Sequence, residues 1–294
     1  MNNIIQLLFD LEISDNNSLS IFHSGTRDNE DINVLRCKKS GVLVLDKICT
    51  SEEFYKNNIH YNEKIGTTHL KDEIVASKPL EDDFRRFDQN KLKFKDKKIL
   101  DFGCGQGGFI KLVDKVTKTT TGIELNKKNR NNLRKIGYDI REDISQLKNY
   151  ETFDYIILNH VFEHLNQPID IMKKLKQHLR LDGEIIIEIP HAKDFLMNTL
   201  NNKNFKKFTF WSEHLILHTK DSLEKFLIHS GFKKKKIVGF QRYPLSNHIY
   251  WMSMGKPGGH KVFDFMNKKY LIDSYNTFLI KRNETDTIIG YFRK

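Results

Sequence analysis

A glycine-rich loop is the first part of the sequence whose residue types could perform chemistry. Residues 99–108 read ILDFGCGQGG, so Gly103, Gly105 and Gly108 match the G-x-G-x-x-G pattern that follows a strand and opens a helix in nucleotide-binding proteins. Glycines at this spacing let the backbone approach a nucleotide-like cofactor closely. The pattern by itself fits both a nicotinamide dinucleotide and S-adenosylmethionine.

Asp101, two residues before the first glycine, favours one of these cofactors. In a dinucleotide site a carboxylate here would face the pyrophosphate, and like charges in a partly desolvated cleft repel each other. S-adenosylmethionine has no phosphate and carries an ammonium and a sulfonium group, which a carboxylate attracts. The sign of this charge favours S-adenosylmethionine. An NAD-dependent oxidoreductase is the alternative, which a test of NADH binding would address.

Acidic residues at the ends of the next two expected strands can bind the rest of such a cofactor. Glu124 follows Gly103 by 21 residues, where a carboxylate can accept hydrogen bonds from both ribose hydroxyls. Asp143 can accept a hydrogen bond from the adenine amino group, and Ile144 can cover the ring. Asp143 can equally act as the N-cap of a short helix, and both interpretations stay open.

Five motifs in order over residues 98–191 resemble class I S-adenosylmethionine-dependent methyltransferases: ILDFGCGQGG, TGIEL, REDI, FDYIILNHVFEHL and GEIIIEIPH. The resemblance implies an α/β fold, a Rossmann-like doubly wound seven-stranded sheet whose last strand is antiparallel. It also implies S-adenosyl-L-methionine as cofactor and S-adenosyl-L-homocysteine as product. The residues expected at the cofactor are Asp101, Gly103, Cys104, Gly105, Glu124, Leu125, Asp143, Ile144 and Asn159.

Histidines that follow the expected strands are candidates for a catalytic base. Methyl transfer is an in-line displacement, in which a hydroxyl nucleophile must lose its proton. Residues 208–232 resemble the W-x-x-EHL segment of a methyltransferase subgroup that includes enzymes acting on sugars and small metabolites, although the spacing before Glu213 is one residue tighter. His214, beside Glu213, is therefore our first candidate, followed by His160 and then His191.

Each of these histidines could instead hold a loop in place. The pattern HVFEH at 160–164 matches a zinc pattern of one metalloprotease class, but it directly follows a strand inside a methyltransferase motif. Glu163 and His164 also resemble a Glu-His pair that binds a divalent metal in some quinone O-methyltransferases. We predict no metal among the site residues and keep this pair as the alternative.

Cysteine usage argues against a zinc module and against disulfides. The same methyltransferase subgroup often has an N-terminal CxxC that opens a zinc-binding module. Here CKKSG at 37–41 keeps Cys37 and Gly41 but has Ser40 at the second cysteine position, so no structural zinc is expected. Together with Cys49 and Cys104 the chain has an odd number of cysteines, which we expect to be free thiols.

Apolar segments of strand length alternate with amphipathic helical stretches from Lys97 onward, which is typical of a parallel sheet. Strands are expected at Lys98–Phe102, Thr119–Glu124, Tyr138–Arg141, Tyr155–Leu158, Glu184–Ile189, Lys236–Gln241 and Thr287–Phe292. Helices are expected at Gly107–Val116, Lys127–Lys135, Pro168–His178 and Asp221–Ser230, the last capped by Thr219 or Asp221. We predict a small N-terminal β-containing appendage (1–78) and a methyltransferase domain (79–294) with acceptor-side insertions near 192–220 and 241–275.

Composition and charge give more information about the cellular location of the protein than about its binding partner. The formal net charge is +11, which fits a lysine-rich surface, a phosphorylated substrate or a nucleic acid. Neither an apolar segment of about 18 residues nor a basic leader is found, so we expect a cytoplasmic protein without a membrane span. The sequence leaves the oligomeric state open.

The acceptor is expected to be a small molecule. Residues 159–162 read NHVF and lack the prolines that base-methylating enzymes carry there, and no Pro-Cys nucleophile is found, which disfavours nucleic acid. A hydroxyl of a nucleotide-linked sugar for surface polysaccharide or glycan biosynthesis fits best. N- or C-methylation of another metabolite, RNA methylation and a non-catalytic cofactor-binding protein are the alternatives. In residues 241–260, groups that could contact a phosphate or stack on a ring are Arg242, Lys256, His260, Tyr243, Tyr250 and Trp251, although this stretch could equally form an interface or a packed loop.

Overall fold

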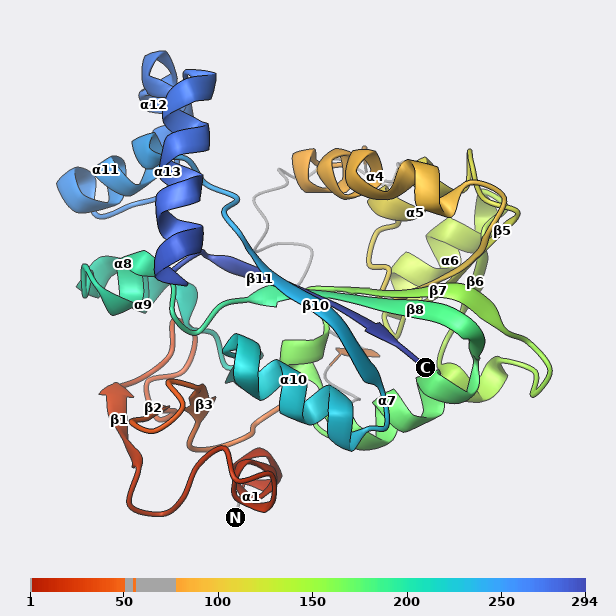
Figure 1. Cartoon of the computed structure of the whole chain (residues 1–294), viewed down its shortest axis with the longest axis horizontal. Coiled ribbons are helices and arrows are strands. Elements are labelled where there is room, and N and C mark those ends of the chain that lie inside the picture. Colours follow the sequence, from red (N-terminus) through yellow and green to blue (C-terminus); the bar gives the residue numbers. More distant parts are fainter. Residues whose placement is uncertain (1, 51–54, 57–77) are drawn as a thin grey trace. The chain divides into compact units, whose positions relative to one another are not determined.

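The larger of two sheets has seven strands in the structure, which is a computed structural model describing residues 2–50, 55–56 and 78–294. The strand order is β10-β11-β8-β7-β4-β5-β6, with parallel pairing among β7, β4, β5 and β6 and an antiparallel last strand (Figure 1). The strands are β4 (Lys98–Phe102), β5 (Thr119–Ile123), β6 (Asp139–Arg141), β7 (Phe153–Asn159), β8 (Leu179–Pro190), β10 (Lys233–Phe240) and β11 (Thr287–Arg293). This architecture confirms the predicted Rossmann-like α/β fold.

The chain divides into two compact units. The first unit comprises residues 1–49, 162–169 and 187–292, and the second comprises 50–161, 170–186 and 293–294. Within the part of the chain that is described, none of the helices has both the length and the apolarity needed to cross a bilayer.

The second unit carries the glycine-rich loop between β4 and α5. Ile99 and Leu100 of β4 are fully buried, as expected for a central strand of a parallel sheet. Asp101 lies opposite Gly122 of β5 and Ile157 of β7, so it occupies the carboxyl end of a central strand. The helical elements assigned wholly or mainly to this unit are α4 (Glu81–Phe94), α5 (Gly108–Val113), α6 (Lys127–Lys135), η1 (Ile144–Gln146) and α7 (Pro168–Gln177).

The first unit contains a four-stranded antiparallel sheet, β1 (Leu19–His23), β2 (Val34–Cys37), β3 (Leu43–Leu45) and β9 (Ile216–Leu217). β9 pairs with β3, so the segment that follows His214 is hydrogen-bonded to the N-terminal part of the chain. The helical elements of this unit are α1 (Asn3–Asp10), η2 (Phe162–His164), α8 (Phe195–Asn198), α9 (Lys203–Thr209), α10 (Lys220–His229), α11 (Leu245–Met254), α12 (Gly259–Val262), η3 (Asp264–Met266) and α13 (Lys269–Arg282).

Most predicted elements are present, with shifted ends. The helix at 127–135 has the predicted bounds, and Thr219 caps α10 in a capping box with Ser222. The helix expected at 107–116 ends at Val113, and the strand expected at 184–189 begins at Leu179. Helices α1 and α4 were not predicted.

The stretch 241–260, which the sequence left open as substrate contacts or as an interface or packed loop, contains helix α11. Pro244 is the N-cap of α11, and Gly255 ends that helix in a left-handed conformation. Trp251 is almost fully buried, and the nearby rings of Phe205 and Phe208 lie 5.2 and 5.1 Å from it between centroids. Burial of this indole therefore contradicts the idea that it stacks on a substrate, and the residue is instead packed within the first unit as part of α11. Tyr250 is likewise buried.

Candidate active site

Asp101 is a buried carboxyl group at the carboxyl end of β4, with 2% of its surface exposed. Its pKa is raised to about 7, mainly by burial and in part by the nearby carboxylates of Asp83 and Glu124, whereas Arg86 opposes the shift. Asp83 and Arg86 belong to α4 and form an ion pair at 3.6 Å. A buried carboxyl group at this position gains from a cationic ligand, which stabilises its ionised form.

Glu124 ties the end of β5 to the glycine-rich loop. Its Oε2 accepts a hydrogen bond from the Gly105 amide at 2.7 Å, and its Oε1 accepts one from the Asn126 amide at 2.7 Å. Burial raises the pKa of Glu124, whereas these two hydrogen bonds and Arg130 act in the opposite direction. Arg130 also donates to the carbonyl oxygens of Glu124 and Leu125 at 2.9 Å. The structure thus brings together three predicted cofactor residues, Glu124, Leu125 and Gly105.

The first glycine of the loop has a steric reason to be glycine. Gly103 has φ +76°, and a Cβ on it would lie 2.5 Å from a methyl carbon of Val161. Val161 follows His160, which itself has φ +53° and directly follows Asn159 at the end of β7. A non-glycine residue in the left-handed region costs about 1 kcal/mol, so the two loops at these strand ends are both conformationally demanding.

The remaining predicted cofactor residues differ in what their side chains contact. Cys104 packs into an apolar cluster with Ile110, Leu133 and Ile140, so its thiol is part of the core. Burial raises the pKa of Cys104 well above its usual value. Asp143 accepts a hydrogen bond from the Ser145 amide at 2.6 Å and is the N-cap of η1, which confirms its capping role. Its contact with adenine stays a prediction, as does that of the half-buried Ile144.

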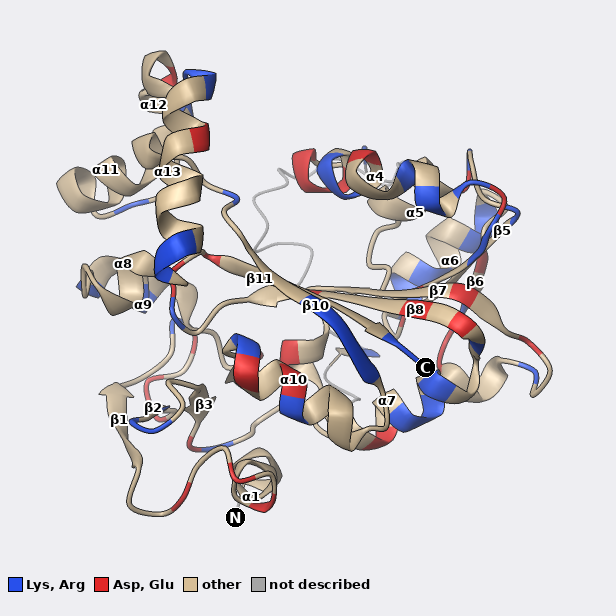
Figure 2. Cartoon of the chain, viewed as in Figure 1, with Lys and Arg blue, Asp and Glu red and all other residues tan. Residues whose placement is uncertain are grey.

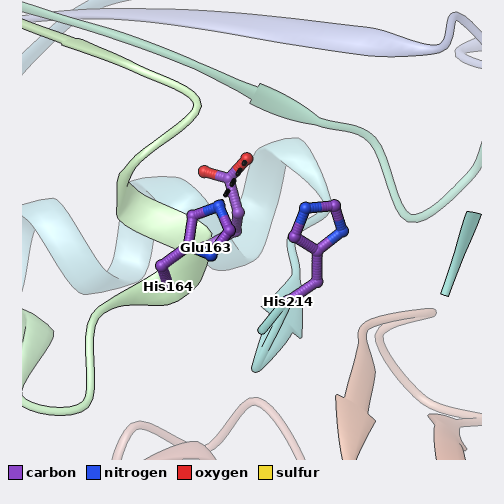
Figure 3. Close-up of side chains that lie close together, drawn as sticks. All are labelled: Glu163, His164 and His214. Atoms are coloured by element: carbon purple, nitrogen blue, oxygen red, sulfur yellow. Dashed lines mark ion pairs between the residues drawn. The ribbon is translucent and has the colours of Figure 1, made fainter. Parts of the chain in front are cut away.

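A second constellation lies within the first unit and is formed by Glu163, His164 and His214 (Figure 3). One ligand atom of each residue lies within 4.8 Å of the others. Oε1 of Glu163 is 4.0 Å from Nε2 of His164, and the rings of His164 and His214 meet edge to face at 4.9 Å between centroids. Glu163 is fully buried, whereas both imidazoles are half-buried. The geometry joins a buried carboxylate to two accessible imidazoles.

Backbone contacts hold the two halves of this constellation together. The Leu215 amide donates to the Glu163 carbonyl at 2.9 Å, and β9 begins directly after Leu215. Glu163 and His164 lie on η2, which follows β7 in the chain, whereas His214 lies on the predicted insertion. The sequence places these residues about 50 positions apart and gives no signal for their contact.

Two N-terminal residues that the sequence did not single out support His214. Asp28 accepts hydrogen bonds from the amide and the hydroxyl of Ser212, at 3.0 and 2.7 Å. The Arg27 guanidinium lies over the rings of Phe208 and Trp211, at 4.5 and 4.3 Å from their centroids. These contacts fix the segment that precedes His214. The local sequence around Arg27 and Asp28 does not predict them.

A comparison with protein families identifies the family to which this fold belongs. Residues 76–236, more than half of the chain, match the family model described as a methyltransferase domain. The chain belongs to this methyltransferase family. The match confirms the class I S-adenosylmethionine-dependent methyltransferase that the motifs predicted.

The individual relatives of the methyltransferase act on different acceptors. The chain is 26% identical over 140 residues to a malonyl-[acyl-carrier protein] O-methyltransferase of Bacillus cereus, covering 41% of this chain and 52% of that protein. It is 29% identical over 109 residues to a tRNA U34 carboxymethyltransferase of Actinobacillus succinogenes, covering 32% of each. The matches thus span about half of the first protein and a third of the second. A crystal structure of a SAM-dependent methyltransferase from Archaeoglobus fulgidus shares the fold, with a TM-score of 0.50, 17% identity and coverage of 71% of this chain and 92% of that one.

His191, the third candidate base of the methyltransferase, has a structural role. It is fully buried, and its Nδ1 lies 2.9 Å from the Thr285 carbonyl oxygen. Burial lowers its pKa to about 3, and the lysines Lys220 and Lys193 contribute in the same direction. An imidazole that is buried and this weakly basic is not a suitable proton acceptor near neutral pH. The alternative interpretation, a histidine that holds a loop, therefore applies to His191.

The constellation of Glu163, His164 and His214 also has the side-chain types of a metal site. Two imidazoles and one carboxylate are a common ligand set for Zn²⁺ and other divalent ions that keep a position open for a substrate oxygen. The same atoms can therefore serve either as a base with a carboxylate partner or as a ligand set.

Proposed function

We propose that the methyltransferase transfers the methyl group of S-adenosyl-L-methionine to a hydroxyl group of a small-molecule acceptor. The acceptor we favour is a nucleotide-linked sugar used for surface polysaccharides or glycans. The observation that carries the proposal is the buried Asp101 at the glycine-rich loop, since a carboxyl group there selects a cationic cofactor over a pyrophosphate. Membership in the methyltransferase family supports the same cofactor.

Each cofactor-side residue has a task in this proposal. Asp101 attracts the ammonium group of the methionine part, and Glu124 accepts hydrogen bonds from the ribose hydroxyls. Glu124 already accepts hydrogen bonds from the Gly105 and Asn126 amides, so its carboxylate is held in one orientation before the cofactor arrives. Leu125 and Ile144 contribute apolar surface, and Asn159 lies at the end of β7.

The methyl transfer itself needs a base for the acceptor hydroxyl. In the proposed step a ring nitrogen of His214 takes the hydroxyl proton while the oxygen attacks the methyl carbon. The carbon–sulfur bond breaks, its electron pair goes to sulfur, and S-adenosyl-L-homocysteine leaves as a neutral thioether. The buried Glu163, whose carboxylate lies within 4.8 Å of the His214 imidazole, stabilises the imidazolium that forms. Glu213, next to His214, remains the acidic neighbour that the sequence predicted, and His160 is the second candidate base.

The acceptor class rests on weaker support than the cofactor. The named relatives methylate a carrier-protein-bound malonyl group and modify a tRNA, so family membership does not define one acceptor. The resemblance of residues 208–232 to sugar-modifying enzymes is the reason to favour a sugar. Methylation at nitrogen or carbon of another metabolite, methylation of RNA and cofactor binding without turnover are the competing functions.

The first experiment is calorimetric titration of the wild type and Glu124→Ala with S-adenosylmethionine and S-adenosylhomocysteine. We expect micromolar binding to the wild type that is lost in the variant. A well-folded wild type that binds neither ligand would overturn the proposal. Formation of S-adenosylhomocysteine from S-adenosylmethionine in the presence of nucleotide-linked sugars then tests the acceptor class, with RNA and small amines as competing acceptors.

Variants of the candidate base test the mechanism once an acceptor is found. His214→Gln should lower kcat about 10²- to 10⁴-fold while leaving the cofactor Kd unchanged. The exposed His229→Gln, at the end of α10, is the matched control and should retain activity. A full loss in His160→Gln together with normal activity in His214→Gln would transfer the base role to His160. If chelation abolishes turnover and divalent ions restore it, the metal alternative replaces the general base.

A further inference from the structure

The N-terminal sheet contains a cavity that the proposed function has not used. It has a volume of about 450 Å³ and lies wholly within the first unit, between β1, the turn that follows β2, and the segment after β8. Cavities of roughly 300–1,000 Å³ are typical of small-ligand sites. Its size therefore suits a ligand larger than a single ion.

The charge of the lining is one-sided. Four cationic side chains line the cavity, Arg36, Lys38, Lys39 and Lys193, and none of its described lining residues is an aspartate or glutamate. Lys38 and Lys39 are exposed, whereas Lys193 is half-buried. Figure 2 shows the two turn lysines as a blue segment between β2 and β3. Several cations around one concave surface without a carboxylate create a positive potential that attracts anions.

Two of the cations are held in place by the fold. The Arg36 guanidinium donates a hydrogen bond to Asn198 Oδ1 at 2.5 Å and lies 5.2 Å from the centroid of the Phe22 ring. Gly41 has φ +79°, and a Cβ on it would lie 3.0 Å from Cε of Lys193. The end of the Lys193 side chain therefore lies close to the turn at Gly41.

Groups near the cavity experience the same positive field. The Lys206 ammonium lies 3.9 Å from the centroid of the Phe22 ring. Burial and the nearby Arg36 lower the pKa of Lys206. Burial also lowers the pKa of His23, with Lys206 and Lys207 as further causes. The cations of this region thus disfavour one another's charged forms, and a bound anion would relieve this repulsion.

We propose that this cavity binds the pyrophosphate group of a nucleotide-linked ligand, with Arg36, Lys38, Lys39 and Lys193 as its cationic contacts. Arginine can bind a phosphate through two parallel hydrogen bonds, and lysines add compact charges. Ile21, which is 63% exposed, and Phe22 supply apolar surface for the remainder of the ligand. The proposal deepens the proposed function, on which its identification of the ligand as the acceptor rests. The binding site itself is defined by these side chains alone.

The lysine-rich composition provides the competing explanation and also the control. Lysines are also dense in β10, whose first four residues are lysines and form a blue segment in Figure 2, but none of them lines this cavity. A solvated lysine surface would bind anions according to net charge, wherever the lysines lie. Anion binding at a specific site, by contrast, depends on the lysines that line that site. Removing two lysines from the cavity or two from elsewhere changes the net charge equally and separates the explanations.

The test measures binding affinity by titrating the purified chain at moderate salt with uridine diphosphate, inorganic pyrophosphate and uridine. S-adenosylmethionine is left out of all titrations. The variants are Lys38→Ala/Lys193→Ala and the control Lys233→Ala/Lys281→Ala, whose lysines are exposed and lie outside the cavity. We expect saturable binding of uridine diphosphate, weaker binding of pyrophosphate and none of uridine. The cavity variant should weaken binding at least about tenfold, and the control should not.

Three results would overturn the proposal. These are the absence of saturable binding to folded wild type, an equal loss of affinity in the cavity and control variants, and equal affinity for pyrophosphate and uridine diphosphate. The last result would define a site for the free anion instead of a nucleotide-linked ligand. Thermal unfolding of each variant checks folding, and Lys38→Glu provides a second variant that should abolish binding without removing a side chain. Because no turnover is measured, failure here is separate from failure of the proposed methyl transfer.

Discussion

The pKa of Asp101 makes cofactor binding dependent on pH. With a pKa of about 7 the carboxyl group is about 90% protonated at pH 6 and about 10% protonated at pH 8. Contact with the cofactor ammonium needs the carboxylate, so binding releases about 0.9 proton from this group at pH 6 and about 0.1 at pH 8. The contribution of Asp101 to the affinity should therefore rise about tenfold between these pH values.

The assay is calorimetric titration with S-adenosylmethionine at pH 6, 7 and 8, in buffers of different ionisation enthalpy so that released protons are counted. Asp101→Asn is the matched variant, since it keeps the shape of the side chain and cannot ionise. The cofactor has an α-amino group that titrates as well, but it does so equally with both proteins. We therefore expect the ratio of Kd between variant and wild type to increase about tenfold from pH 6 to pH 8. A ratio that stays constant over this range would refute the reasoning.

The same substitution should stabilise the protein without ligand. A carboxyl group whose pKa is raised from 3.8 to about 7 contributes fully below pH 3.8, and its contribution is lost as the pH rises through 7. At pH 8 the cost in the wild type is at most about 4 kcal/mol, at 1.36 kcal/mol for each pKa unit. Urea unfolding at pH 8 should show Asp101→Asn to be more stable than the wild type, with a smaller difference at pH 5. A less stable variant at pH 8 would contradict the buried charge.

Two further predictions concern stability. Gly107 has φ +76°, and a Cβ on it would lie 2.4 Å from the buried Leu133, so Gly107→Ala should lower the free energy of unfolding by about 2–4 kcal/mol in urea. Gly137→Ala, with φ +97° but no neighbouring atom within 4 Å, is the control that reports backbone strain alone, and an equal loss in both would refute the steric argument. Burial lowers the pKa of His191 and of His218 to about 3. Their neutral forms therefore stabilise the protein fully above pH 6.5, the pKa of an ordinary histidine. This stability is lost as the pH falls toward 3, by up to about 1.4 kcal/mol per pH unit for each histidine. Urea unfolding at pH 7 and pH 5 should show a smaller acid loss in His191→Gln than in the wild type, and an unchanged loss would indicate that this histidine does not titrate on unfolding.

The central sheet could be predicted because its information is local. Apolar segments of strand length such as ILDF, alternating with amphipathic stretches, specify a parallel α/β sheet wherever they occur. The capping box of Thr219 and Ser222 is similarly contained within four residues. Helix α11 was missed because its buried residues include the polar Ser246, Asn247 and His248, so it has no continuous apolar stripe. Pro244 and Gly255 resemble loop residues, although they are the caps at its two ends.

The sequence by itself determined the family and the cofactor, and it predicts the residues on the cofactor side of the site. Asp101, the glycines and Glu124 follow strands that are adjacent in a doubly wound sheet, so their positions follow from the order of the motifs. Even the sign of the charge at Asp101, which distinguishes S-adenosylmethionine from a dinucleotide, is readable from one residue.

The tertiary structure alone decided which side chains meet across long stretches of the chain. Glu163 and His214 come together because β9 begins beside η2 and pairs with β3, and Asp28 fixes Ser212 from 184 residues away. It also decided the protonation of His191, since burial, which lowers its pKa to about 3, depends on every element packed around it. Long-range contacts and desolvation depend on the folded surroundings, so two identical local sequences can have different contacts and different pKa values. Strand patterns and helix caps, by contrast, are fixed by neighbours in the chain.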